Sequence, residues 1–462
     1  MIKAGYEKYK GSLFKVPTFE TSSGWLVVAA GQDVANEIRK ASEDHFDATQ
    51  TVIDLLQMAH TFGEDVCKAE AYHVDVTRRQ LTKNIETLFP EVFDELKAAF
   101  NDHLPQTEDW VSYPTMDTFV HIICRISNRF FFSDLPLCKA LLPYSLHRRT
   151  DICSGRNEEF LKLQEGFTTQ VFLAATAISL VPEPLRPLFG RLLSRVPRAT
   201  RILKEMFGAI IQERIQKDDE LGKDWEGRPN DLISWLLESV PEKQRNIDDL
   251  VTRIMFMEFG ALHTTTITIS DALFNLSVHR EHIGPLRAEA EEAIAQYGWS
   301  REACNKMVKL DSFMKESSRL AGLNSVYLIR KVQKDFTFSN GVTVPAGYTV
   351  GCVSHAAQHD SSLYDNSGEF DGFRFCKAES DVNSTKSMTS PDPKFFLFGS
   401  GRHMCPGRYF ATAEIKAMLA YILINYDFRL PDDSKTIPEG QWFSSQRSAH
   451  TTAKIQLRKR RT

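Results

Sequence analysis

The sequence predicts a mainly α protein with a small β region, organised as a single domain over residues 1–462. Apolar residues recur at helical spacing through most of the chain, whereas the alternation typical of strands is confined to two places. Hydrophobic residues make up 42% of the chain and charged residues 25%, as in soluble proteins with a large core. No repeat or break in composition divides the sequence, so we expect one domain.

Helical periodicity is clearest in four segments: 31–42, 80–103, 230–240 and 280–298. A fifth segment, 253–276, is apolar on all sides, and we therefore expect a helix that passes through the core. Strand signals lie at "SGWLVVAA" and at 334–353, where an Asn-Gly pair between β-forming residues predicts a hairpin.

Composition excludes several classes of function. The net charge of −4 gives no electrostatic basis for nucleic-acid binding. The eight cysteines form no CxxC pair and no zinc spacing, which favours free, mostly buried thiols in a reducing compartment. The apolar runs at 25–30 and 171–181 are too short to span a bilayer.

One cysteine stands in an informative context, "FGSGRHMCPGR". Cys405 follows a glycine-rich turn, and apolar spacing predicts a helix that begins at Pro406. Free N–H groups at the helix start, with Arg402, His403 and Arg408 nearby, predict stabilisation of a thiolate. Gly399 and Gly401 allow the preceding backbone to turn tightly.

Phe398, Gly401, Cys405 and Gly407 resemble the haem-binding signature of the cytochrome P-450 superfamily. His403 stands where most members have Arg, and this variant is similar to filamentous-fungal members of the ent-kaurene oxidase type. The resemblance covers nearly the whole chain. It implies the cytochrome P-450 fold, haem b as cofactor and Cys405 as axial ligand of the iron.

Three further positions match the family's charged triad. Glu316 and Arg319 form an ExxR pair on one helix face, and Arg374 follows in "FDGFRF". The resemblance implies that the three are buried together and support the haem-side core.

The apolar segment 253–276 resembles the family's oxygen-activating helix. Gly260 and Ala261 leave room above the iron, and the Thr264 hydroxyl would bond back to a helix carbonyl, open a local gap for water and relay protons. His263 replaces the usual acid before the threonine, and Glu258 is an alternative proton carrier.

The resemblance also implies partners for the anionic haem propionates and for the substrate. The propionate candidates are Arg330, His403, Arg78 and His73, although the His73–Arg78 spacing is one residue longer than is common. The expected substrate pocket includes Phe256, Gly260, Ala261, Asn324, Ser325, Tyr327 and Arg447.

The function implied is a haem-thiolate monooxygenase that inserts one atom of dioxygen into a hydrophobic small molecule, with a terpenoid or similar secondary metabolite as the expected substrate. Electrons would come from NADPH through cytochrome P-450 reductase, with cytochrome b5 as a further donor. Two alternatives remain: an isomerase or dehydratase that acts on a peroxide, against which Thr264 argues, and a non-catalytic haem-binding protein.

Location and assembly are also expectations from the resemblance. Residues 180–199 are apolar and basic together, which favours peripheral contact with a membrane. With an N-terminal anchor, the protein would lie on the cytoplasmic face of the endoplasmic reticulum; without one, in the cytoplasm. We expect a monomer whose basic residues dock the acidic reductase; these are Arg78, Arg79, Lys83, Arg402 and Arg408.

Overall fold

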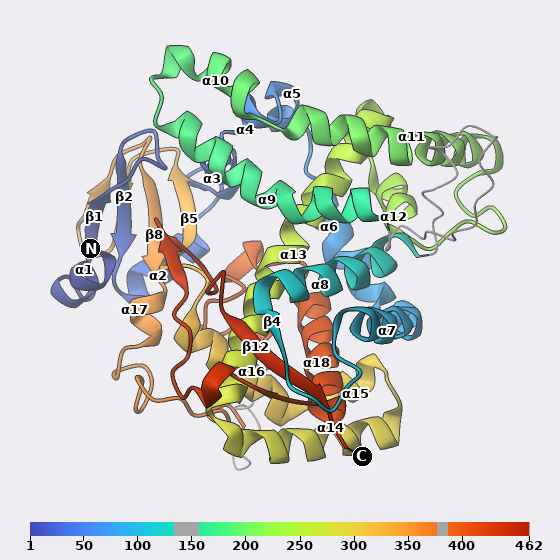
Figure 1. Cartoon of the computed structure of the whole chain (residues 1–462). Helices are drawn as coiled ribbons and strands as arrows, with labels where there is room; N and C mark the ends of the chain where they lie inside the picture. Colours follow the sequence, from blue (N-terminus) through green and yellow to red (C-terminus); the bar gives the residue numbers. More distant parts are fainter. Residues whose placement is uncertain (134–156, 377–386, 462) are drawn as a thin grey trace.

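The computed structural model describes residues 1–133, 157–376 and 387–461 (Figure 1). Cys138 and Cys153 lie outside these residues. The long helices are α7 (Thr82–His103), α8 (Thr115–Phe132), α9 (Glu158–Ser179), α11 (Val196–Leu221), α13 (Ile247–Val278), α14 (Ile283–Tyr297), α16 (Val308–Ala321) and α18 (Arg408–Asn425). The shorter ones are α1 (Ile2–Lys8), α2 (Gln32–Lys40), α3 (Ala48–Leu55), α4 (Met58–Thr61), α5 (Glu64–Lys68), α6 (His73–Val76), α10 (Arg186–Leu193), α12 (Leu232–Ser239), α15 (Arg301–Lys306) and α17 (His355–Gln358).

Within the described residues, the β region consists of one sheet of five strands, one of three and two of two. The larger sheet has the order β1-β2-β8-β5-β3 and lies at the N-terminal side of the molecule (Figure 1). Its strands are β1 (Leu13–Pro17), β2 (Trp25–Ala29), β8 (Thr349–Val353), β5 (Val326–Val332) and β3 (Phe46–Asp47). The others are β4 (Val111–Pro114), β12 (Lys454–Lys459) and β9 (Tyr426–Arg429), then β10 (Gln441–Phe443) with β11 (Gln446–Ser448), and β6 (Phe336–Thr337) with β7 (Thr343–Val344).

These elements confirm the predicted fold class and all five predicted helices. The Asn340-Gly341 turn joins β6 to β7 as predicted, with Gly341 at a φ of +83°. The central helix α13 is longer than the apolar segment predicts, because polar residues extend its N-terminus. There the Asn246 side chain accepts the backbone N–H of Asp249, and two acidic residues lie in the first turn.

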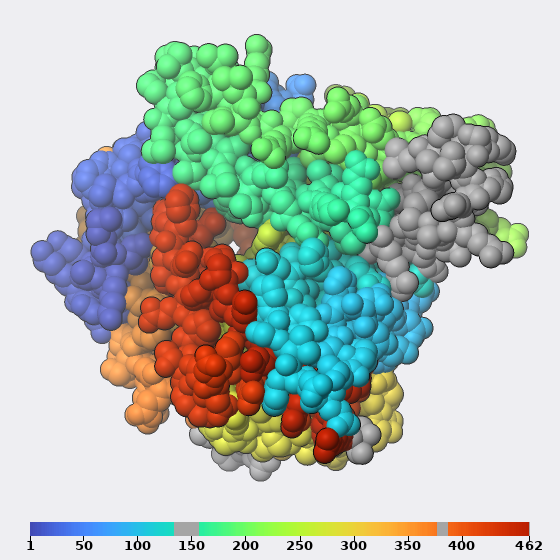
Figure 2. Space-filling model, in the orientation of Figure 1, coloured from blue at the N-terminus to red at the C-terminus, as the bar shows by residue number. Residues whose placement is uncertain are grey.

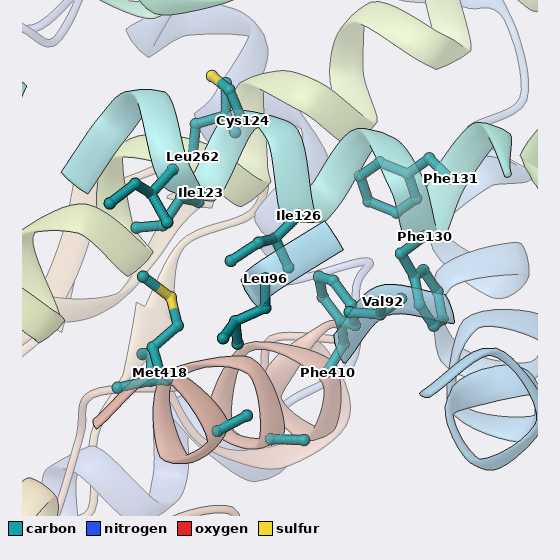
Figure 3. Packing of buried hydrophobic residues seen from close by; sticks show 14 of the residues in the cluster. Val92, Leu96, Ile123, Cys124, Ile126, Phe130, Phe131, Leu262, Phe410 and Met418 are labelled. Atoms are coloured by element: carbon teal, nitrogen blue, oxygen red, sulfur yellow. The ribbon is translucent and has the colours of Figure 1, made fainter. Parts of the chain in front are cut away.

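The main core lies where α7, α8, α13 and α18 meet (Figure 3). Phe130 and Phe410 pack with ring centroids 4.5 Å apart, and together they join α8 to α18. Leu262 brings α13 into the same cluster, so these four helices form one rigid framework.

Figure 2 shows a narrow opening between the red C-terminal segment and the green and cyan helices, through which part of α13 is visible.

Among the described helices, none is long and apolar enough to cross a membrane.

Candidate active site

A cavity of about 380 Å³ lies between α13 and α18. Its walls are largely apolar and come from the loop before α18, the start of α18, α13, the α6–α7 segment and the turn after α16. The lining residues predicted from the sequence are His73, Phe256, Gly260, Ala261, Thr264, Asn324, Phe398, Cys405 and Gly407.

Cys405 lies on the α18 side of the cavity. Its backbone N–H donates to the Phe398 carbonyl over 2.9 Å, which closes the loop, and Gly399 and Gly401 have φ values of +73° and +74°. Glycine adopts this left-handed conformation without the steric cost that a Cβ brings. The sequence therefore predicted the tight turn correctly.

The helix after the cysteine begins at Arg408, two residues later than predicted, since Pro406 and Gly407 complete the turn. Burial raises the pKa of the Cys405 thiol, while the N–H groups of Gly407 and Arg408 and the Arg408 charge offset part of this effect. Arg402 and His403 do not contribute, because both face the loop after α2.

Thr264 faces the cavity from α13, and its hydroxyl donates to the Gly260 carbonyl over 3.2 Å, as predicted. The predicted local gap is absent from this helix: α13 is continuous from Ile247 to Val278, and Thr265, Thr266 and Thr268 make the same kind of bond. At Gly260 an added Cβ would meet nothing within 4 Å, so the space beside Thr264 is open.

The two predicted proton carriers beside Thr264 do not line the cavity. His263 points toward α9, where its Nε2–H donates to the Glu165 carbonyl over 3.1 Å, and burial lowers its pKa. Glu258 is buried on another face of α13, and within the described residues neither of its carboxyl oxygens has a hydrogen-bond partner. Helical geometry is the reason, since residues one and six positions before Thr264 lie on different faces from it.

The predicted propionate partners divide into two groups. Arg330, His403 and Arg78 lie outside the cavity lining. His403 donates to the Glu43 carboxylate over 2.5 Å, and the charges of Glu43 and Arg330 interact. Arg78 is paired with Asp75 on the surface. His73 lines the cavity and stacks on Phe256, and burial lowers its pKa to about 4, which keeps the ring neutral.

Three predicted pocket residues lie elsewhere. Tyr327 stacks on Phe396 on the far side of β5, with ring centroids 3.9 Å apart. The Ser325 hydroxyl bonds to the Ser445 carbonyl. Arg447 forms a bidentate ion pair with Asp271. Strand alternation and these contacts turn the three side chains away from the cavity.

The structure brings the predicted triad together. Arg319 donates to both oxygens of Glu316, at 2.7 and 2.9 Å, and the Arg374 Nε lies 3.0 Å from the same carboxylate. Glu316 and Arg319 have no exposed side-chain surface. Both arginines also donate to backbone carbonyls between 358 and 369, so the network fixes the chain that leads toward the cysteine loop.

Several lining residues were missed by the sequence analysis: Val74, Thr77, Leu81, Phe131, Thr265, Thr268, Leu323, Leu397, Pro406, Phe410, Ala411 and Ile415. Most are apolar residues at helical spacing, a pattern that equally describes core packing. Only their position beside Cys405 distinguishes them.

A comparison with known proteins decides the family. The chain matches the cytochrome P450 family over residues 2–452. It belongs to that family. It is 34% identical to cytochrome P450 monooxygenase 71 of Postia placenta, covering 100% of this chain and 88% of the relative. It is 29% identical to ent-kaurene oxidase P450-4 of Gibberella fujikuroi, covering 100% and 87%.

A solved structure confirms the P450 fold. Retinoic acid-bound cyanobacterial CYP120A1 superimposes with a TM-score of 0.71 over 99% of this chain and 93% of its own, at 16% identity. The family relatives establish that this chain is a monooxygenase of the P450 type.

The family's haem cofactor fits the cavity. One thiol, Cys405, lies on one side, and open space beside Gly260 lies on the other, with apolar walls between them. A flat apolar macrocycle needs this arrangement, and a cysteine thiolate is one of the axial ligands that proteins use for haem iron.

Two buried carboxyl groups lie outside the cavity lining. Glu258 and Glu414 are fully buried, and burial raises the pKa of each to about 8. The charge of Glu414 disfavours ionisation of Glu258 further, while the Gln164 side chain offsets part of the rise in the pKa of Glu258. Ser127 donates a hydrogen bond to Glu414 over 3.2 Å. Both carboxyls are therefore protonated at neutral pH.

Breaking the triad is expected to destabilise the fold strongly. In Glu316→Gln, the buried Arg319 and the largely buried Arg374 lose their carboxylate, which costs on the order of 3–5 kcal/mol. The measurement is the urea midpoint of the purified variant. Glu64→Gln, in the exposed Glu64–Lys68 pair, is the control and should change stability by less than about 0.5 kcal/mol. Similar effects of both substitutions would contradict a buried, fully used triad.

The acid pair predicts a pH dependence of stability. Because the folded chain holds protons that the unfolded chain releases above a pKa near 4.5, these groups lower stability as pH rises from about 4.5 to 8. In Glu414→Gln this contribution is removed, so the variant's urea midpoint should rise relative to wild type more at pH 8 than at pH 5. Parallel pH profiles of wild type and variant would refute the assignment.

Proposed function

We propose that this chain oxidises an apolar small molecule of terpenoid size with one atom from dioxygen, using haem b and electrons from NADPH. The observation that carries the proposal is that Cys405, in the loop before α18, and Thr264, on α13, line the same apolar cavity. Fungal relatives that match the whole of this chain, among them an ent-kaurene oxidase, support a terpenoid or similar metabolite as substrate.

Each residue's proposed role follows from its position in the cavity. Cys405 would hold the iron, and the haem would supply activation of dioxygen. Thr264, whose hydroxyl bonds to the Gly260 carbonyl beside the open space there, would hold and pass protons. The apolar walls exclude water and orient the substrate, with His73 and Asn324 as polar groups in the lining. Arg330 and His403 are proposed to reach the haem carboxylates at the cavity edge.

Electron supply is proposed to come through cytochrome P-450 reductase, with cytochrome b5 as a further donor. Arg78 and Arg402 are about half exposed and lie together, since the Arg78 guanidinium donates to the Arg402 carbonyl over 3.4 Å. This basic surface borders the cysteine loop. It is a suitable docking site for an acidic partner.

Membrane contact is proposed for α10 and its flanks, which lie at the outer edge of the molecule, at the top of Figure 1. Six leucines there are exposed: Leu173, Leu180, Leu185, Leu188, Leu192 and Leu193. Arg191, Arg195 and Arg198 are also exposed beside them. Apolar and basic side chains together favour an anionic bilayer surface, such as the cytoplasmic face of the endoplasmic reticulum.

Replacing Thr264 is expected to separate electron use from product formation. In Thr264→Ala, product per NADPH consumed should fall at least about tenfold and hydrogen peroxide should rise, since proton delivery is lost. The measurement is NADPH, peroxide and product in a reductase-reconstituted reaction with a panel of diterpenes. Thr266→Ala is the matched control, because that hydroxyl makes the same helix bond but lies outside the cavity lining. Product formation without NADPH or reductase would contradict the proposed function.

Charging the leucine patch is expected to abolish vesicle binding. Leu188→Glu with Leu192→Glu should weaken sedimentation with phosphatidylcholine–phosphatidylserine vesicles by on the order of tenfold or more, because each leucine loses its apolar burial. Leu221→Glu, at an equally exposed leucine on α11, is the control. Equal vesicle binding by the wild type, the double variant and the control would exclude this surface as the membrane-binding site.

A further inference from the structure

A hairpin far along the chain is joined to the cavity wall by backbone hydrogen bonds. The Arg447 N–H donates to the Leu323 carbonyl over 2.8 Å, and the Ser325 N–H donates to the Ser445 carbonyl over 2.8 Å. Asn324 forms a bridge with Gln446. Leu323 and Asn324 both line the cavity, so the β10–β11 hairpin determines where this wall lies.

The hairpin is in turn tied to α13 by one buried ion pair. The Arg447 Nη1 lies 2.7 Å and its Nη2 3.1 Å from the two oxygens of Asp271. The two side chains are only 8% and 5% exposed. Asp271 lies less than one helical turn beyond Thr268, which lines the cavity, so the pair reaches from the cavity's own helix to its wall.

Local geometry is adapted to this ion pair. At Gly440, an added Cβ would lie 2.4 Å from the Arg447 guanidinium carbon and 2.4 Å from the Ser448 carbonyl oxygen. Only glycine lets the Arg447 side chain pass this point toward Asp271. Among the described residues that line the cavity, none belongs to the hairpin itself, so Arg447 does not touch a ligand there.

We propose that the Asp271–Arg447 pair is a positioning contact that fixes the Leu323–Asn324 wall and thereby selects the size and shape of the substrate. The inference rests on the proposed binding of an apolar substrate in this cavity. A buried bidentate pair is costly to desolvate and adds little net stability, but it allows one orientation of the hairpin. A preorganised wall binds a large ligand more tightly because less ordering is lost on binding.

The test uses two haem-coordinating azoles of different size as probes, imidazole and 4-phenylimidazole, titrated by the shift of the Soret band. In Asp271→Asn and Arg447→Lys, the dissociation constant for 4-phenylimidazole should rise by on the order of tenfold. That for imidazole should stay within about twofold, because the small ligand needs no contact with the wall. Amide exchange at Ser325 and Arg447 should accelerate in both variants, and this readout does not depend on haem.

The matched controls are Asp231→Asn and Arg214→Lys, at an equally buried bidentate pair that joins α11 to the N-terminus of α12, outside the cavity lining. They should leave the ratio of the two azole dissociation constants unchanged. The conservative Arg447→Lys keeps a charge at the site if Asp271→Asn fails to fold. Equal changes for both azoles, or none, together with unchanged amide exchange, would overturn the inference. Absence of a haem-thiolate spectrum in the wild type would instead contradict the proposed function.

Discussion

The position of Cys405 depends on a loop that closes on itself. The hydrogen bond from its N–H to the Phe398 carbonyl and the two left-handed glycines between them hold the thiol at the cavity. The loop has little freedom because α18, which follows it directly, is fixed in the core by Phe410 and Met418. The triad fixes the chain on the other side, where Arg319 and Arg374 bind carbonyls between 358 and 369. The position of the Cys405 sulfur therefore depends on contacts in distant parts of the fold.

Buried charge in this protein has two different uses. In the triad and in the Asp271–Arg447 pair, each carboxylate meets guanidinium groups with good geometry, so the charges fix backbone segments that are distant in sequence. Glu258 and Glu414 have no cation, and burial keeps them protonated instead. The first arrangement specifies orientation. The second leaves two protonated carboxyls in the protein interior.

The sequence predicted the elements that carry strong local signals. The helix at α13, the Asn-Gly hairpin and the glycine turn before Cys405 follow from periodicity and from backbone preference, and each is present. The triad was predictable because its three positions match a family motif, although their burial was not visible in the residues themselves.

Side-chain direction was the part that sequence did not determine. Tyr327 and Arg447 lie near the predicted pocket in the chain, but strand alternation and a partner on α13 turn them away from it. Asp271 carries no local signal, because its role depends on a hairpin that begins 170 residues later, at Gln441. Glu43 was missed for the same reason, since only the fold brings it to His403.

The most direct measurement is the absorption spectrum of the reduced protein saturated with carbon monoxide, for wild type and Cys405→Ser. Thiolate ligation predicts a strongly red-shifted Soret band in the wild type that is lost in the variant. The same band in both proteins, an ordinary haem band in the wild type, or no haem at all would contradict Cys405 as the iron ligand.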